Sequence, residues 1–353
     1  MATDTSETNG KGPVKLTTLY DLPDRKISRL ESMLGPELYR LVYGTFRNPL
    51  SIAGLILILF FILVAVFAPV IAPPPATLRN PYYIPRDGYS PLPQPPGAVW
   101  KNNPMPLPFY WKALTGGETM THIFGTTSGQ WDIYYAVVWG TRTALMVGVL
   151  VVLFTVLVGV IVGAVSAFYG GIIDNILMRI TEVFYTFPFL MSALTLSAIL
   201  TPVIGKGVWP ATIALVTFGW MTYARLVRGD VLSIKEREYI MAARITGAKD
   251  MRILGKHIVP NAIYPTLVLA SMNVGDVVLG FAALSFLGVG VEVGYADWGQ
   301  IISFARNFIP QLFMYWYILI FPGIALIMFV MGFNLMGDAL RDIMDPKMRG
   351  RGA

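Results

Sequence analysis

The chain has 353 residues, of which 55% are hydrophobic and 14% are charged, whereas soluble domains carry roughly 25% charged residues. It has no cysteine and two histidines, which excludes a disulfide framework and leaves too few ligands for a histidine-based zinc site. The formal net charge is +6, which by itself fits either nucleic-acid binding or the basic cytoplasmic side of a membrane protein.

Six continuous apolar runs along the chain predict transmembrane helices. Barrel strands would alternate apolar and polar residues, and these runs do not. The fourth run is the shortest of the six. The runs cover residues 50–68, 143–168, 183–200, 208–223, 263–286 and 313–336. The predicted fold is therefore an all-α integral membrane protein with six spans.

Lysine and arginine are distributed unequally between the two sides that six spans would create. Of the 27 basic residues, 20 lie in the N-terminal tail, near Arg179, in the segment Arg225–Lys256 and in the C-terminal tail. The positive-inside rule places these segments, and so both termini, in the cytoplasm. This topology accounts for the net charge, so no nucleic-acid role is expected.

The runs and this orientation predict five parts of the chain. They are a cytoplasmic N-terminal tail (1–49), a first transmembrane helix (50–72), an extracytoplasmic loop rich in proline and aromatic residues (73–142), a transmembrane core (143–336) that contains a cytoplasmic loop at 225–262, and a cytoplasmic C-terminal tail (337–353).

The long outer loop is dense in proline, tyrosine and tryptophan from residue 72 to about residue 131. The proline density argues against a regular fold. Two interpretations remain open: the loop is a docking surface for an extracytoplasmic partner, or its aromatic side chains rest at the membrane interface.

Motifs of several enzyme classes are missing from the sequence. There is no Gly-x-x-x-x-Gly-Lys-Ser/Thr phosphate loop, no His-Glu-x-x-His metal motif and no Gly-x-Ser-x-Gly elbow. The glycines of Gly288–Gly294 lack the dinucleotide spacing and follow a span, so they predict a turn. We expect no catalytic residue, no metal site and no cofactor on this chain. Any ATP would be used by other chains.

The inner loop predicts a short helix at Lys235–Ile245, which Gly247 ends. The small side chains of Ala242 and Ala243 permit another backbone to approach closely. This pattern fits an ordinary amphipathic surface helix, and it also fits a helix that docks into a groove on a partner.

The same segment resembles the "EAA" loop of ABC importer permeases, which reads Glu-Ala-Ala, three residues, Gly, and further on Ile-x-Pro. The chain matches it at Ala242, Ala243, Gly247, Ile258 and Pro260. Met241 stands where that family usually has glutamate, and Glu238, one turn earlier, is a candidate substitute. With Arg244, these residues form the coupling site that the resemblance implies.

Further segments, in the same order, resemble the C-type permease of the dipeptide, oligopeptide and nickel importers. His122–Asp132 is similar to that family's His-x-x-Gly-Thr-Asp-x-x-Gly-Arg-Asp segment, and it departs at Thr127, Gln130 and Trp131. The other matches are Arg47–Leu50, Tyr169–Asp174, Met178–Arg179, Phe187–Phe189, Leu284–Gly288, Trp298–Gly299, Phe333–Asp342 and Asp345–Pro346.

The resemblance implies a non-catalytic, multi-pass subunit of the cell membrane that forms the substrate pathway. The implied partners are a second homologous permease, two ATPase subunits that carry ATP and Mg²⁺, and an extracytoplasmic substrate-binding protein. Peptide is the cargo expected first, with oligosaccharide or nickel as alternatives. A secondary transporter is a remoter reading, because no clear internal repeat is visible. A membrane enzyme would need paired catalytic groups, which the spans lack.

Polar and small residues inside the spans suggest further roles. Asp276 is an acid well inside a span, where an ionised carboxylate costs about 2.5–3.5 kcal/mol unless it faces protein or water. It could meet a substrate ammonium or a metal ion, be protonated, or pair with a partner subunit. Asn273 shares its helix face, and the two are candidate pathway residues. Gly159-x-x-x-Gly163 predicts close helix packing, and Pro188 and Pro322 predict kinks.

Overall fold

The computed structural model describes residues 45–344, apart from residues 47, 103–104, 109 and 118. The predicted N-terminal tail lies almost wholly outside these residues, as do Arg47, Asp345–Pro346 and the end of the C-terminal tail. In chain order the helices are α3 (Pro49–Ile71), α4 (Trp111–Thr115), α5 (Ile133–Tyr169), α6 (Gly171–Thr186), α7 (Phe189–Ile204), α8 (Val208–Gly219), α9 (Met221–Ile234), α10 (Glu238–Ile245), α11 (Asp250–Ile253), the π-helix η1 (Leu254–Ile258), α12 (Val259–Phe286), α13 (Trp298–Ala305), the 3₁₀-helix η2 (Arg306–Gln311), α14 (Leu312–Tyr315) and α15 (Tyr317–Met344).

Four of the described helices are long and apolar enough to cross a membrane, and one bent pair is a fifth candidate. The four are α3, α5, α15 and the continuous helix Asp250–Phe286, which contains α11, η1 and α12. The bent pair is α6 and α7. The described part of the chain holds isolated β-bridges and no strands, so the all-α membrane fold class is confirmed.

The third predicted span, 183–200, is wrong as a single helix, because α6 and α7 meet there at 89°. Pro188 is the N-cap of α7, and Phe187 before it is extended, with φ −79° and ψ 136°. A proline disfavours the α conformation of the residue before it, so the helix has to end at Thr186. The predicted kink at Pro188 is therefore a full break. Pro322, by contrast, lies within the continuous helix α15.

The fourth predicted span, 208–223, also takes a different form. α8 has 12 residues, about 18 Å of helix, which is short of a ~30 Å hydrocarbon core. Trp220 separates it from α9, which carries Arg225, Arg228 and Asp230. The apolar run thus ends in α9, where charged residues begin at Arg225. Neither α8 nor α9 is long and apolar enough to span a membrane by itself.

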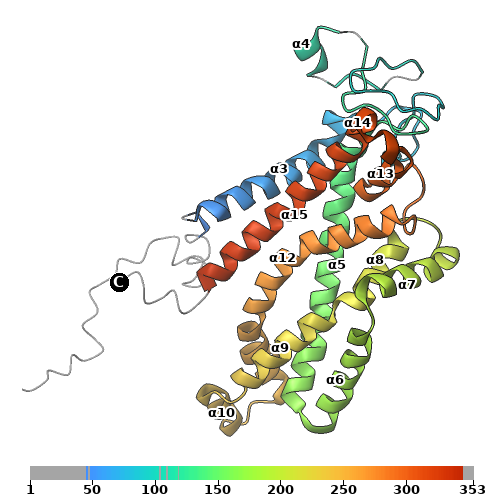
Figure 1. Ribbon diagram of the computed structural model, residues 1–353. Helices are drawn as coiled ribbons and strands as arrows, with labels where there is room; N and C mark the ends of the chain where they lie inside the picture. Colours follow the sequence, from blue (N-terminus) through green and yellow to red (C-terminus); the bar gives the residue numbers. More distant parts are fainter. Residues whose placement is uncertain (1–44, 47, 103–104, 109, 118, 345–353) are drawn as a thin grey trace, which may run out of the picture.

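α5 is the central helix, packed against α3, α8, α9 and α12, and Figure 1 shows it running through the length of the molecule. It begins at Ile133, ten residues before the predicted span, because Asp132 caps it by accepting the N–H of Tyr135 at 2.7 Å. Its glycines permit contact with α9. A Cβ on Gly159 would lie 2.4 Å from the Tyr223 Cβ, which confirms the packing role of the Gly159-x-x-x-Gly163 pair.

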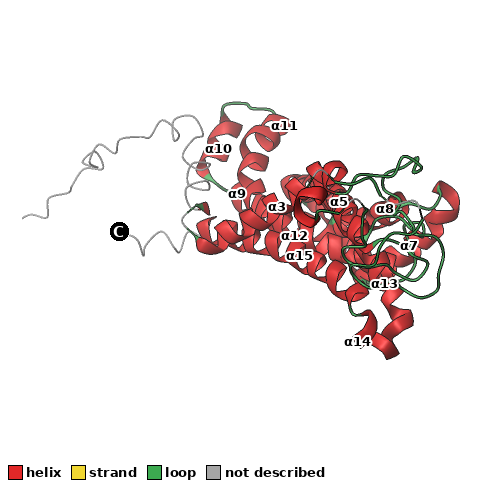
Figure 2. Cartoon of the chain, turned by 90° about the horizontal axis from the view of Figure 1, so that it is seen from above, coloured by secondary structure: helices red, strands yellow, loops and turns green. Residues whose placement is uncertain are grey.

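Residues 72–132, here named the cap, gather at one end of the helices with α13 and α14, and α10 lies at the other end (Figure 1). The described cap is irregular, as its prolines predict, but it is packed. Its bridges join Arg86 to Trp131 and Val99 to Thr121, and a further bridge joins Tyr83 to Tyr295. Seen from above, green loops cover the helix ends near α13 (Figure 2).

A buried histidine holds the cap together. His122 is fully buried, with Nδ1 2.7 Å from an Asp132 carboxylate oxygen and Nε2 3.3 Å from one of Asp87. Its ring lies against Trp100, with centroids 4.2 Å apart. Buried polar groups stabilise a fold only when they are partnered, and both ring nitrogens here are. The segment His122–Asp132, which resembles the permease motif, therefore stabilises the folded cap.

Two of the three departures in that segment, Gln130 and Trp131, fit this packing. Gln130 has φ +63°, a conformation that glycine adopts most easily. Its amide nitrogen donates to the Leu92 carbonyl at 2.6 Å. Trp131 lies under the Arg86 guanidinium, 4.4 Å from its ring centroid. Trp131 stands where the similar family has arginine, and Arg86, from another part of the cap, packs against its ring.

Candidate functional site

The inner loop forms the predicted short helix, three residues shorter at its start. α10 begins at Glu238, because Lys235 ends α9 and its Nζ donates to the Ala167 carbonyl at 2.8 Å. Its C-terminus is a Schellman motif. Gly247 donates to the Arg244 carbonyl and Ala248 to the Ala243 carbonyl, at 3.0 and 3.1 Å, and Gly247 has φ +80°. Gly247 ends the helix as predicted.

One side chain anchors α10 to the rest of the molecule. Ile240 is fully buried, in a cluster that includes Val227, Ile253 and Ile258. A short isolated helix is marginal in water, so its order depends on such packing. α10 is thus held at a fixed place between α9 and α11.

The other face of α10 is available for contact. Glu238, Ala242, Arg244 and Gly247 are exposed, and Ala243 is half-buried. Sequence reasoning missed three large apolar side chains on this surface, whose exposed fractions are 45%, 49% and 87%. They are Tyr239, Met241 and Ile245. The helical positions around the buried Ile240 were the signal that could have found them.

Ile258 and Pro260 lie apart from the α10 surface. Ile258 is buried below α10, and Pro260 is in the first turn of α12. Proline cannot donate to a preceding carbonyl and its ring crowds that turn. The π-helical segment Leu254–Ile258 directly before it widens the turn. The Ile-x-Pro part of the motif therefore shapes the helix that leaves the loop.

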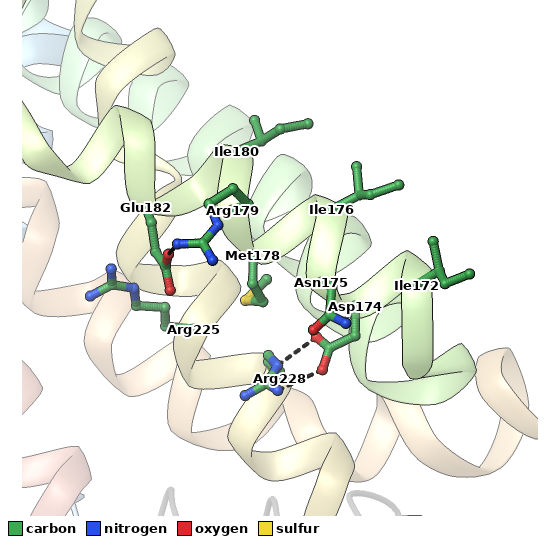
Figure 3. Close-up of a pocket in the computed structure, with 10 residues that line it drawn as sticks. All are labelled: Ile172, Asp174, Asn175, Ile176, Met178, Arg179, Ile180, Glu182, Arg225 and Arg228. Atoms are coloured by element: carbon green, nitrogen blue, oxygen red, sulfur yellow. Dashed lines mark hydrogen bonds and ion pairs between the residues drawn. The ribbon is translucent and has the colours of Figure 1, made fainter.

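A cleft of about 810 Å³ lies between α6 and α9, and Figure 3 shows its lining. Arg228 donates two hydrogen bonds across it to the Asp174 carboxylate, from Nε at 2.7 Å and from Nη2 at 2.6 Å. Ser166 also donates to Asp174. Ile172 and Ile176 point away from this pair (Figure 3). Bidentate arginine–carboxylate pairs fix orientation as well as distance, so α9 is tied to α6 just before it leads into α10.

The candidate pathway residues lie on a different cavity. Asn273 and Asp276 on α12 line a cavity of about 350 Å³ together with residues of α6, α7, α8 and α9. Asn273 Nδ2 donates to the Tyr223 phenol oxygen at 2.8 Å, and Asp276 is exposed. The structure brings these two residues together, and it separates them from the α10 surface.

No group of three or more potential ligands that could hold a metal ion occurs among the described residues. The site so far consists of a short helix with an exposed face, an ion-paired cleft and a cavity between membrane helices that contains Asp276. It offers surfaces for contact and a place for a solute, in a helical membrane protein. These are features of a transport subunit.

Comparison with known proteins identifies the class. Residues 156–350 match the family model described as binding-protein-dependent transport system inner membrane component, and residues 45–96 match the N-terminal TM domain of oligopeptide transport permease C. The chain belongs to this family of inner-membrane transport permeases. It is accordingly a multi-pass membrane subunit of a transport system.

Three relatives are similar in sequence to most of this chain. The dipeptide transport system permease protein DppC of Alkalihalophilus pseudofirmus is 35% identical over 86% of this chain and 88% of its own. The oligopeptide permease protein OppC of Bacillus subtilis is 35% identical over 86% and 87%. The glutathione permease protein GsiD of Pectobacterium atrosepticum is 35% identical over 71% and 83%.

Among solved structures, the chain resembles the inward-facing MetNI methionine ABC transporter. The TM-score is 0.49, with 20% sequence identity over 60% of this chain and 98% of the other.

Proposed function

We propose that this chain is the C-type permease subunit of an ATP-driven peptide importer and forms part of the peptide pathway. The observation that carries the proposal is α10: an exposed short helix, anchored by Ile240 and closed at Gly247, between α9 and α12. It supports docking to an ATPase, since a fixed helix can transmit motion to both flanking helices. The names of the relatives support peptide as cargo.

The proposed complex contains a second permease, two ATPase subunits that bind ATP and Mg²⁺, and a substrate-binding protein. Both termini and α10 are proposed to lie in the cytoplasm, and the cap outside. Glu238, Ala242, Ala243, Arg244 and Gly247 form the proposed ATPase contact, while Ile258 and Pro260 support it from below. Asn273 and Asp276 are proposed to face the pathway.

The cap is proposed as the surface that receives the binding protein. The alternative interpretation placed its aromatics at the membrane interface, but Trp100 and Trp111 are only 5% and 6% exposed. Their rings pack inside the cap and are not free to meet lipid. A rigid cap whose surface bears the exposed Tyr89 and Leu92 favours docking.

The test is ATP-dependent uptake in vesicles that contain the complete complex. Addition of labelled trialanine with the binding protein should give uptake that requires ATP. An Ala242→Arg variant should abolish it, because Ala242 is exposed and the large side chain would hold the ATPase away from α10. Uptake that continues without ATP, or persists unchanged in A242R, would count against the proposal.

A further inference from the structure

The cavity beside Asp276 lies at the meeting point of the two helix breaks. Phe187 and Phe189 flank the bend between α6 and α7, and Gly219 and Met221 flank the junction of α8 and α9. α12 and Thr155 of α5 complete the lining. Interrupted membrane helices leave irregular backbone, which is tolerated at membrane depth where it is buried in protein or lines a water-filled cavity. The volume, about 350 Å³, lies near the lower end of the ~300–1,000 Å³ of ligand cavities.

The charge of this cavity is one-sided. Asp276 is the one charged residue among those that line it; the others are Thr155, Tyr185, Phe187, Phe189, Leu215, Phe218, Gly219, Met221, Thr222, Tyr223, Asn273 and Val277. No ion pair joins Asp276 to any described residue. Arg225 on α9 lies against the Tyr185 ring of the same cavity, with its guanidinium 4.0 Å from the ring centroid, and makes no ion pair with Asp276. The carboxylate is therefore available to a cation that enters from outside the chain.

The rest of the lining suits the same kind of group. Phe187 and Phe189 are 58% and 40% exposed, so their rings are accessible, and aromatic ring faces attract cations. The Tyr185 ring already carries the guanidinium of Arg225. The Tyr223 phenol already accepts a hydrogen bond from Asn273. This bond fixes both polar groups on the wall that carries Asp276. A carboxylate set among aromatic rings is a recognition environment for an ammonium group.

We propose that Asp276 and the aromatic wall form a subsite for the primary ammonium group of the transported peptide. This inference rests on the proposed function, since it assumes a peptide in the pathway. The ammonium has two possible sources, the amino terminus and a lysine side chain. Both would place a positive charge against Asp276, beside the rings of Phe187 and Phe189.

The experiment measures peptide binding to the detergent-purified complex without its binding protein, so that selection by that protein does not enter. The probes are trialanine, N-acetyl-trialanine and N-acetyl-dialanyl-lysine. Asp276→Asn removes the charge with little change of shape, and Asp276→Glu keeps it. ATPase activity without peptide confirms that each variant complex is assembled.

Asp276→Asn should weaken trialanine binding about tenfold, on the scale of a hydrogen bond to a charged group, and D276E should retain most of the affinity. N-acetyl-trialanine should bind weakly and equally to all three proteins. If N-acetyl-dialanyl-lysine also depends on Asp276, the subsite accepts any primary ammonium. If it does not, the subsite is specific for the amino terminus.

Equal trialanine affinity in wild type and D276N would overturn the inference, as would an equal loss for the free and acetylated peptides. Absence of trialanine binding to the wild-type complex would overturn it as well. The proposed function fails separately, when the wild-type complex shows no ATP-dependent peptide uptake. Normal uptake with unchanged D276N binding would remove only the ammonium subsite.

Discussion

Asn273 on α12 donates its amide to the phenol oxygen of Tyr223 on α9 at 2.8 Å. These two helices flank the loop that contains α10, because α9 leads into it and α12 follows it. The bond therefore joins the helix that enters the α10 loop to the helix that leaves it, at the wall of the cavity that Asn273 and Asp276 line. The helices on both sides of α10 are thus joined by a hydrogen bond that involves Asn273, one of the residues proposed to face the pathway.

The first prediction concerns this bond. Tyr223→Phe leaves the half-buried Asn273 amide without its acceptor, and the loss of one neutral hydrogen bond costs about 0.5–1.5 kcal/mol. The apparent melting temperature of the purified complex should fall by several degrees. Tyr89→Phe, at an 83% exposed ring of the cap, is the matched control and should not change it. A Y223F complex as stable as the control would show that the bond does not join the helices.

The second prediction concerns the end of α10. Gly247 has φ +80°, and Gly247→Ala should cost about 1–2 kcal/mol, because a Cβ is disfavoured in the left-handed region. Hydrogen exchange at the amides of residues 246–248 should speed up, and less ATPase should remain bound during purification. Gly255→Ala serves as the control, since a Cβ there meets no atom within 4 Å. Unchanged exchange in G247A would rule out the Schellman motif.

The third prediction tests the packing of α5 on α9. A Cβ at Gly163 would lie 2.3 Å from the Ala224 carbonyl oxygen, so Gly163→Ala has to push two backbones apart, at a cost of about 1–3 kcal/mol or more. The yield of monodisperse complex in size-exclusion chromatography should drop sharply. Gly323→Ala in α15 has open space and should give a normal yield. Equal yields would contradict the packing described above.

The fourth prediction is a pH dependence of the cap. Burial by itself would raise the pKa of Asp87, but hydrogen bonds from Asn102, Lys101 and His122 outweigh burial and lower this pKa below its usual 3.8. The folded cap thus binds fewer protons than the unfolded one. The stability that Asp87 contributes is complete above the unfolded pKa and is lost as pH falls through the folded pKa.

Thermal unfolding of the cap, followed by tryptophan fluorescence from neutral pH down to about pH 2, measures this effect. Asp87→Asn should lower stability at neutral pH and flatten the acid limb of the curve. Glu182→Gln, at an exposed ion pair on α6, should leave both unchanged. Parallel acid limbs for wild type and D87N would show that another group carries the acid sensitivity.

Much of the helical plan was predictable because it depends on local pattern. The long apolar runs and the end of α10 at Gly247 follow from hydrophobicity and backbone preference. Pro188 predicted a kink, but the backbone preference of proline does not determine the angle of 89° between α6 and α7. That angle depends on the packing of α6 and α7 against the rest of the bundle.

The parts that were missed depend on contacts between distant residues. His122 was visible only as a member of a motif, while its partner Asp87 lies 35 residues away, and only the folded cap brings them together. The exposed Ile245 gave no signal without knowledge that Ile240 faces inward. Asp276 stood out in the sequence as a membrane acid, but the rings around it come from other helices.

The most direct test of the account is purification of the tagged chain from its native membrane in mild detergent, with mass spectrometry of the proteins that co-elute. The account predicts two kinds of stoichiometric partner, a second multi-span permease and ATPases with a phosphate loop. It also predicts that Ala242→Arg, at an exposed position of α10, loses the ATPases and keeps the permease. A chain that elutes alone, folded, and moves peptide in vesicles without ATP would contradict it.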